Sequence, residues 1–196
     1  MAKSNKEWLR RHVTDHYVKQ AKKQGYRSRA AFKLLELDEK ESILKPGQTV
    51  LDLGAAPGSW SQIAAGKVKP GGRVIAIDLL DIAPISGVTV QKGDFRRVSI
   101  DVEADVVLSD LSPNLSGIPN VDQARSLELA QGAIELCRKV LKRDGVFVTK
   151  AFHGEAFDDV LAALRAVFNK VKVVKPSASR GESAETYFVA RALRAR

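Results

Sequence analysis

Gly54 and Gly58 mark a turn at which the backbone can approach a bound molecule closely. Residues 50–60 read VLDLGAAPGSW, which predicts a buried strand, a turn and the start of a helix whose first N–H groups are free. The G-x-x-x-G spacing differs from the dinucleotide motif G-x-G-x-x-G, and the Lys-Ser/Thr pair of a phosphate-binding P-loop is missing from the segment. The turn therefore predicts a ligand site that is suited neither to NAD nor to nucleoside triphosphates.

Aspartates follow the next three predicted strands. Asp78 comes 20 residues after Gly58, at a strand end where a carboxylate can accept hydrogen bonds from both ribose hydroxyls of an adenosine. Asp94 follows Gly93 and can accept from an adenine amino group, and Asp110 opens the segment DLSPN after a further strand. Core packing explains such an ordered series of acids poorly, so the series predicts an adenosine-containing ligand.

These motifs together resemble the FtsJ/RrmJ family of S-adenosylmethionine-dependent ribose 2′-O-methyltransferases. The likeness runs through GAAPGSW, a downstream DLL, GDF, SDLSPN, VTKAF and SRGESAETY, and it covers roughly residues 26–191. It implies S-adenosylmethionine as the cofactor. Besides Gly54, the residues that it implies for the cofactor pocket are Gly58, Trp60, Asp78, Asp94 and Asp110.

The family's catalytic set is Lys-Asp-Lys-Glu, and all four members are present in this sequence. By their motifs they are Lys33 in RSRAAFK, Asp110 in SDLSP, Lys150 in VTKAF and Glu185 in SAETY. One departure lies near the turn, where Ser59 occupies a position that is usually a second glycine. The resemblance thus implies an intact catalytic centre.

Methyl transfer from a sulfonium to an alcohol requires a group that accepts the hydroxyl proton. A lysine can do so only when it is neutral, and a neighbouring cation or desolvation lowers its pKa from about 10.4. We therefore predict that Lys150 accepts the proton, that Lys33 is the neighbouring cation, and that Asp110 and Glu185 hold the two amines. These carboxylates favour the charged form of lysine and so oppose the lowering of its pKa. Alignment of the reactants can by itself lower the reaction barrier by about 7–11 kcal/mol.

Short β-branched runs alternate with helical stretches along the chain, which predicts an α/β fold. The predicted helices are Ser28 to Leu44, Ser59–Lys67, Val121–Leu141 and Glu155–Phe168, and the predicted strands are Thr49–Leu53, Arg73–Ile77, Val88–Gln91, Asp105–Ser109, Gly145–Ala151, Lys170–Val174 and Thr186–Ala190. This alternation predicts a mainly parallel sheet with helices on both faces and ligands beyond the carboxyl ends of the strands. The family resemblance implies a Rossmann-like, seven-stranded methyltransferase sheet with an antiparallel last strand.

Basic residues are concentrated at the start of the chain. The 196 residues, a length that suits one domain, carry 32 Lys and Arg against 23 Asp and Glu, a net charge of +9. Ten basic and only two acidic residues lie in residues 1–33, with Trp8 and Tyr17 among them. Cations bind phosphates by releasing counterions, and aromatic rings can stack on exposed bases. We predict that residues 1–27 form a basic RNA-binding extension and residues 28–196 the methyltransferase domain.

Composition also excludes several classes of protein and site. No apolar run reaches the roughly 18 residues that a membrane span needs, and the N-terminus lacks the apolar core of a signal peptide, so we expect a cytoplasmic protein. Cys137 is the only cysteine, which excludes an intrachain disulfide. The three histidines His12, His16 and His153 are scattered, so we expect no metal. We expect a monomer.

The resemblance implies that the acceptor is a uridine in large-subunit ribosomal RNA, and that the partner is this RNA or the large ribosomal subunit. One alternative keeps the chemistry and places the acceptor in a tRNA anticodon loop. Another is a noncatalytic RNA-binding factor for ribosome assembly, although such a factor would not need Lys33, Asp110, Lys150 and Glu185 together. A small-molecule methyltransferase would not need the basic segment.

Overall fold

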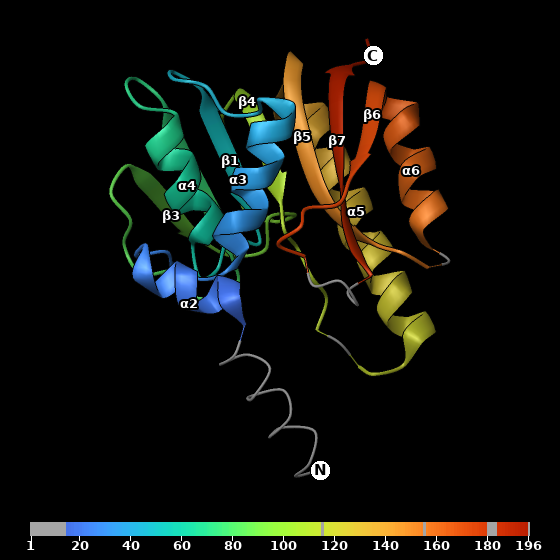
Figure 1. Ribbon diagram of the computed structural model, residues 1–196. Coiled ribbons are helices and arrows are strands. Elements are labelled where there is room, and N and C mark those ends of the chain that lie inside the picture. The colour runs from blue at the N-terminus through green and yellow to red at the C-terminus, as the bar shows by residue number, and fades with distance from the viewer. Residues whose placement is uncertain (1–14, 115, 155, 180–183, 196) are drawn as a thin grey trace.

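A seven-stranded sheet separates two layers of helices in the computed structural model, which describes residues 15–114, 116–154, 156–179 and 184–195 (Figure 1). The strands are β1 Thr49–Leu53, β2 Arg73–Asp78, β3 Val88–Lys92, β4 Ala104–Ser109, β5 Leu141–Phe152, β6 Phe168–Val174 and β7 Glu185–Leu193. They lie in the order β3-β2-β1-β4-β5-β7-β6. The pairs among β1 to β5 are parallel, and β7 runs antiparallel to both β5 and β6. The predicted Rossmann-like sheet is confirmed.

Of the five helices in the described residues, four cover the two faces of this sheet in pairs and the first lies at its edge. The helices are α2 His16–Lys23, α3 Ala30–Glu41, α4 Ser59–Lys67, α5 Pro119–Val140 and α6 Ala156–Val167. Alternate residues of β1 point to opposite faces, so that Val50 packs with α3 and α4 whereas Leu51 packs with α5 and α6. Each pair of helices thereby encloses its own apolar core. Among the described residues, no helix is both long and apolar enough to cross a membrane.

Nine of the eleven predicted elements differ from the observed ones by one to four residues at one or both ends, and two of the larger differences have a local cause. The helix that starts after Ser28 ends at Glu41 instead of continuing to Leu44, because the side chain of Asp38 accepts hydrogen bonds from the N–H groups of Ile43 and Leu44 at 3.0 and 2.8 Å. Strand β5 begins at Leu141, four residues earlier than predicted, since Leu141 pairs with Ala104 of β4. Neither change moves a predicted site residue out of its element.

Helix α2 lies at the edge of the sheet where the parallel strands end, at the bottom of Figure 1. It packs against α3 through the buried Ala21 and through Tyr17, whose ring centroid is 5.4 Å from that of Phe32. Arg29 forms an ion pair with Asp15, the residue that caps α2. Residues 1–14 of the predicted extension lie outside the described residues. The described part of the extension is thus attached to the body, and the division at residue 27 stays a prediction.

Candidate active site

The turn after β1 has the conformation that its glycines predict. Gly54 and Gly58 have φ angles of +71° and +102°, a region that other residues rarely adopt. A Cβ atom at Gly54 would lie 2.8 Å from Leu111 Cδ2, and one at Gly58 would lie 2.6 Å from Ile85 Cδ1. Helix α4 begins directly after Gly58. Both glycines are therefore required by backbone geometry and by the close approach of neighbouring loops.

A hollow of about 220 Å³ lies beside this turn. Its lining comprises Ala30, Asp52, Gly54, Ala55, Ala56, Pro57, Ser59, Trp60 and Asp110. The indole of Trp60 is buried, and its Nε1 donates a hydrogen bond to the carbonyl oxygen of Ala30 at 2.8 Å. Of the predicted cofactor residues, the structure thus brings Gly54, Trp60 and Asp110 into one wall, next to Gly58.

Asp52 also lines this hollow, and its role was not predicted from the sequence. Its Oδ2 accepts a hydrogen bond from Ser61 Oγ at 2.6 Å, whereas its buried Oδ1 has no hydrogen-bond partner among the described residues. Burial, aided by the negative charges of Asp110 and Asp78 and opposed by the bond from Ser61, raises the pKa of Asp52 from 3.8 to about 7. An unpartnered buried oxygen is costly unless a ligand or a water molecule supplies its hydrogen bond.

The titration of Asp52 predicts a pH-dependent stability difference between the chain and its Asp52→Asn variant. Folded Asp52 keeps its proton up to about pH 7, whereas in the unfolded chain it loses the proton near pH 3.8. Between these values the folded state binds more protons, so the unaltered chain loses up to about 1.4 kcal/mol of stability per pH unit as the pH rises. Asparagine does not titrate, so we expect the stability difference to grow in favour of the variant by about 3 kcal/mol between about pH 4.5 and 7.5. Urea unfolding at about pH 4.5, 6 and 7.5 measures this difference, and parallel pH profiles would contradict it.

Asp78 and Asp94 lie at the ends of β2 and β3, at the same edge of the sheet. Asp78 accepts hydrogen bonds from the N–H groups of Ala56 and Leu80 at 2.9 and 2.8 Å, and so ties the glycine turn to the loop after β2. Asp94 forms an ion pair with Arg96 at 2.8 Å, and the hydrogen bonds from Arg96 lower the pKa of this carboxyl. Neither residue lines the 220 Å³ hollow. Their roles in binding a cofactor stay predictions.

The four predicted catalytic residues form two ion pairs. Lys33 Nζ lies 2.8 Å from Glu185 Oε2. Lys150 Nζ donates a hydrogen bond to the carbonyl oxygen of Asp110 at 2.9 Å and lies 3.2 Å from Asp110 Oδ1. The two lysine side chains are only 10% and 6% exposed, so both amines are held in place by their carboxylates.

Tyr187 connects these pairs and was not singled out from the sequence. Its hydroxyl donates a hydrogen bond to Asp110 Oδ1 at 2.9 Å, and Lys33 Nζ lies 5.9 Å from its ring centroid. Burial, reinforced by the charge of Asp110, raises the pKa of Tyr187 well above its ordinary value, so the phenol stays protonated and acts as a donor. A signal was available in the sequence, because residues two apart on a strand share a face and Tyr187 follows Glu185 by two.

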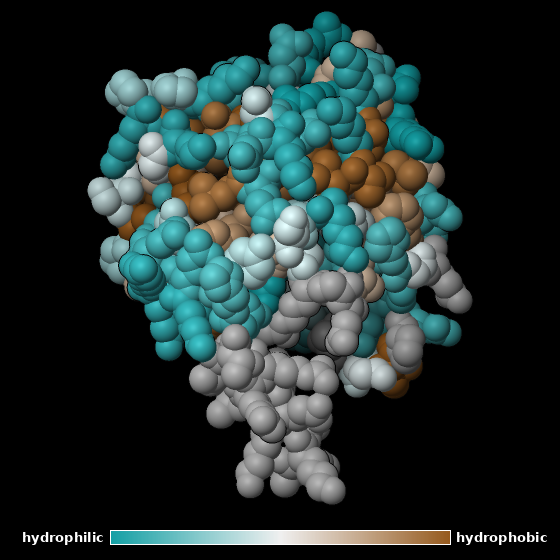
Figure 2. Space-filling model, in the orientation of Figure 1, coloured by the Kyte–Doolittle hydropathy of each residue, from teal (hydrophilic) through white to brown (hydrophobic). Residues whose placement is uncertain are grey.

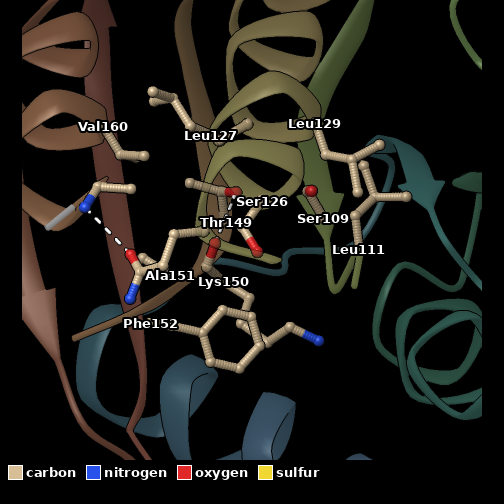
Figure 3. Close-up of a pocket in the computed structure, with 13 residues that line it drawn as sticks. Ser109, Leu111, Ser126, Leu127, Leu129, Thr149, Lys150, Ala151, Phe152 and Val160 are labelled. Atoms are coloured by element: carbon tan, nitrogen blue, oxygen red, sulfur yellow. Dashed lines mark hydrogen bonds between the residues drawn. The ribbon is translucent and has the colours of Figure 1, made fainter. Parts of the chain in front are cut away.

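A second hollow, of about 420 Å³, lies between α5 and the ends of β4 and β5 (Figure 3). Leucines and the ring of Phe152 line it, together with the hydroxyl-bearing residues Ser109, Ser126 and Thr149. Lys150 also lines this hollow, but Figure 3 shows its amine lying apart from the hydroxyl groups. Since Asp110 lines the 220 Å³ hollow, the Lys150–Asp110 pair stands between the two.

In the part of the chain that the structure describes, no group of three or more His, Cys, Asp or Glu side chains is placed to hold a metal ion.

Comparison with known proteins gives one family. The family model described as FtsJ-like methyltransferase matches residues 26–193. The chain is 50% identical over 196 residues to the ribosomal RNA large subunit methyltransferase E of Nitrosospira multiformis, and the match covers 95% of each chain. It is 47% identical over 195 residues to the protein of the same name from Methylobacillus flagellatus, covering 95% of this chain and 94% of that one.

Solved structures share the fold. A Plasmodium falciparum protein assigned as a ribosomal RNA methyltransferase superposes with a TM-score of 0.78 at 28% identity, covering 87% of this chain and 100% of that one. Fibrillarin of Aeropyrum pernix, solved with bound S-adenosyl-L-methionine, superposes with a TM-score of 0.58 at 16% identity, over 82% of this chain and 73% of its own. At that identity, the likeness to fibrillarin concerns the fold alone.

Proposed function

Because the chain belongs to the FtsJ-like methyltransferase family, it is a methyltransferase, and we propose that it methylates the ribose 2′-hydroxyl of a uridine in large-subunit ribosomal RNA. Its methyl donor is S-adenosylmethionine. Relatives that match nearly the whole chain are named for methylating this class of RNA. The observation that carries the proposal is the position of Asp110, which lines the hollow beside the glycine turn and also holds the amine of Lys150.

The residues around the 220 Å³ hollow fit S-adenosylmethionine in charge. When bound, this donor supplies a methyl group activated by a positive sulfonium, and it also carries a positive ammonium group. The unpartnered Oδ1 of Asp52 and the carboxylate of Asp110 suit these cations, and both carboxylates line the hollow beside the glycine turn. We assign Asp52 and Asp110 to the cationic end of the donor, Asp78 to its ribose and Asp94 to its adenine, with Gly54, Gly58 and Trp60 forming the wall.

Proton removal is assigned to the Nζ atom of Lys150 in its neutral form. Asp110 fixes this amine through its backbone carbonyl and its carboxylate, and Tyr187 fixes that carboxylate in turn. Lys33, paired with Glu185 and lying 5.9 Å from the Tyr187 ring centroid, contributes positive charge that attracts the phosphates or the hydroxyl oxygen of the acceptor. In this proposal the acceptor is aligned and deprotonated by side chains whose positions are already fixed by their contacts with one another.

A labelling experiment tests the proposed function. The protein is incubated with methyl-tritiated S-adenosylmethionine and one of three acceptors: large ribosomal subunits, protein-free large-subunit RNA, or tRNA, each taken from cells that lack this enzyme. We expect label only in the large-subunit samples, and nuclease digestion followed by mass spectrometry should identify 2′-O-methyluridine. A label in tRNA would favour the anticodon-loop alternative. Donor binding without any label would favour the noncatalytic assembly factor.

The surface of α2 supports docking of the RNA beside the catalytic residues. Lys19, Lys22 and Lys23 are exposed there, and Figure 2 shows a hydrophilic surface over α2, at the lower left of the molecule. This helix lies at the sheet edge that carries the site. We propose that these lysines, with the basic residues that precede them in the sequence, bind RNA phosphates.

Replacing Lys19, Lys22 and Lys23 together with glutamine should weaken RNA binding without changing donor binding. Each lost phosphate contact lowers the slope of log K against log salt by about 0.7 to 0.9, so we expect a loss of about 2 in slope. Filter binding at several salt concentrations measures it. The matched control carries glutamine at three exposed lysines of the opposite sheet edge, Lys45, Lys69 and Lys139. Equal slopes for the two triple variants would contradict the docking role of α2.

We also propose that the protein acts as a monomer in the cytoplasm. The support is its substrate, because ribosomal RNA is available there, together with a site that this one chain supplies from both of its ends, as the Lys33–Glu185 pair shows. Light scattering coupled to size-exclusion chromatography tests the oligomeric state, and a dimer mass at assay concentrations would contradict it.

A further inference from the structure

The guanidinium of Arg27 joins two loops at the carboxyl edge of the sheet. Its Nη1 donates hydrogen bonds to the carbonyl oxygens of Pro57 at 2.9 Å and Ala83 at 2.8 Å, and its Nη2 donates to that of Pro84 at 2.7 Å. Pro57 belongs to the glycine turn after β1, whereas Ala83 and Pro84 belong to the loop after β2. These two loops are otherwise connected here by the Asp78–Ala56 hydrogen bond and by apolar contacts of Ile82 and Ile85.

The backbone around Arg27 is itself fixed to the first turns of α4. Gln62 accepts a hydrogen bond from the N–H of Arg27 at 3.3 Å and donates one to the carbonyl oxygen of Gly25 at 2.9 Å. Ser28 Oγ and Ser59 Oγ lie 2.7 Å apart, so the residue that replaces the usual glycine adds a contact at this junction. The guanidinium therefore reaches the two loops from an anchored position.

Both loops border the place assigned to the methyl donor. Pro57 lines the 220 Å³ hollow, and the loop after β2 starts at Asp78. A Cβ atom at Gly58 would lie 3.1 Å from Arg27 Nη1, so the guanidinium sits directly against the turn. Three carbonyl oxygens in different directions match the planar fork of an arginine, whereas a lysine ammonium is a compact charge that cannot reproduce this geometry.

We propose that Arg27 is a positioning residue for the methyl donor, because its guanidinium holds the glycine turn and the loop after β2 in the arrangement that binds the donor. A loop that is held before binding loses less conformational freedom when the ligand arrives, which favours affinity. The hydrogen bonds of the guanidinium go to the glycine turn and to the loop after β2, so we expect its effect to be confined to donor binding. This inference rests on the proposed function, since it takes the ligand to be S-adenosylmethionine.

Calorimetric titration of the full chain with S-adenosylmethionine tests the proposal. Arg27→Met keeps the length of the side chain and removes its donors, and we expect the donor Kd to rise about tenfold. Arg27→Lys should recover only part of this loss. The control is Arg143→Met, an exposed arginine near the start of β5 at the opposite edge, which should leave the Kd unchanged.

Steady-state kinetics separate positioning from a general loss of structure. For Arg27→Met and Arg27→Lys we expect the KM for the donor to rise with the Kd, while the kcat at saturating donor and RNA stays within about twofold. Unchanged donor binding in Arg27→Met, or a fall in kcat with an unchanged donor KM, would overturn the inference. If the unaltered chain bound no S-adenosylmethionine, the proposed function itself would be wrong. If the unaltered chain and Arg27→Met bound it equally well, only the inference about Arg27 would be wrong.

Discussion

A Lys150→Met protein is expected to bind S-adenosylmethionine as tightly as the unaltered chain and to transfer methyl groups about 10²- to 10⁴-fold more slowly. Methionine keeps most of the volume of the side chain but has no group that accepts a proton. The Lys150 side chain is 6% exposed and its amine is held by Asp110, so its replacement removes a fixed proton acceptor. Lys150 is absent from the lining of the 220 Å³ hollow, and donor affinity should therefore persist.

Single-turnover methylation of large ribosomal subunits, with the protein in excess, measures the chemical step. Lys150→Arg adds a sharper comparison, because a guanidinium keeps the positive charge and cannot be deprotonated in a protein. We expect Lys150→Arg to be as slow as Lys150→Met. Full activity of Lys150→Arg would contradict the role of Lys150 as proton acceptor. It would indicate that the rate enhancement comes from alignment of the reactants and from positive charge. Lys172→Met, at an exposed lysine of β6 that pairs with Glu41, is the control and should retain the full rate.

Gly58→Ala is expected to weaken donor binding about 100-fold. At a φ of +102°, alanine is strained, and its Cβ atom would lie 2.6 Å from Ile85 Cδ1, so the loop after β2 must move. Strain and displacement of about 3 kcal/mol correspond to roughly this loss of affinity. Titration with S-adenosylmethionine measures it.

Gly66→Ala is the matched control, because it makes the same change within α4, the helix that begins directly after Gly58. A Cβ atom at Gly66 meets nothing within 4 Å, and its backbone is helical. Alanine in a helix is more stable than glycine by about 0.5–1 kcal/mol, so Gly66→Ala should bind the donor normally and unfold at a higher urea concentration. An affinity within threefold of normal for Gly58→Ala would show that the turn tolerates a side chain.

Elements whose limits are set by local chemistry were predictable from the sequence. Helix Ser59–Lys67 and strand Thr49–Leu53 have the predicted bounds, because a glycine turn separates them and both carry buried apolar runs. The end of α3 was not predictable in the same way. It depends on Asp38 Oδ1, which accepts hydrogen bonds from the N–H groups of Ile43 and Leu44, and these bonds are known only from the folded structure.

The same distinction applies to the site. Motif order identified Lys33 and Glu185, and the structure pairs them across 152 positions of sequence. Asp52 escaped notice because it sits inside an apolar strand, where an aspartate has no sequence signal until a neighbouring hollow appears. Arg27 looked like one of many cations in the basic segment, and only the positions of three carbonyl oxygens set it apart. Roles of individual site residues therefore stay predictions that the variants above test.

The position of β7 within the sheet has a consequence for the synthesis of the protein. This strand inserts between β5 and β6, and two residues at its start, Glu185 and Tyr187, contact Lys33 and Asp110, which come much earlier in the sequence. A chain still being synthesised lacks these partners until β7 has been made. A product that stops before β7 therefore lacks two members of the proposed centre, and we expect it not to modify RNA.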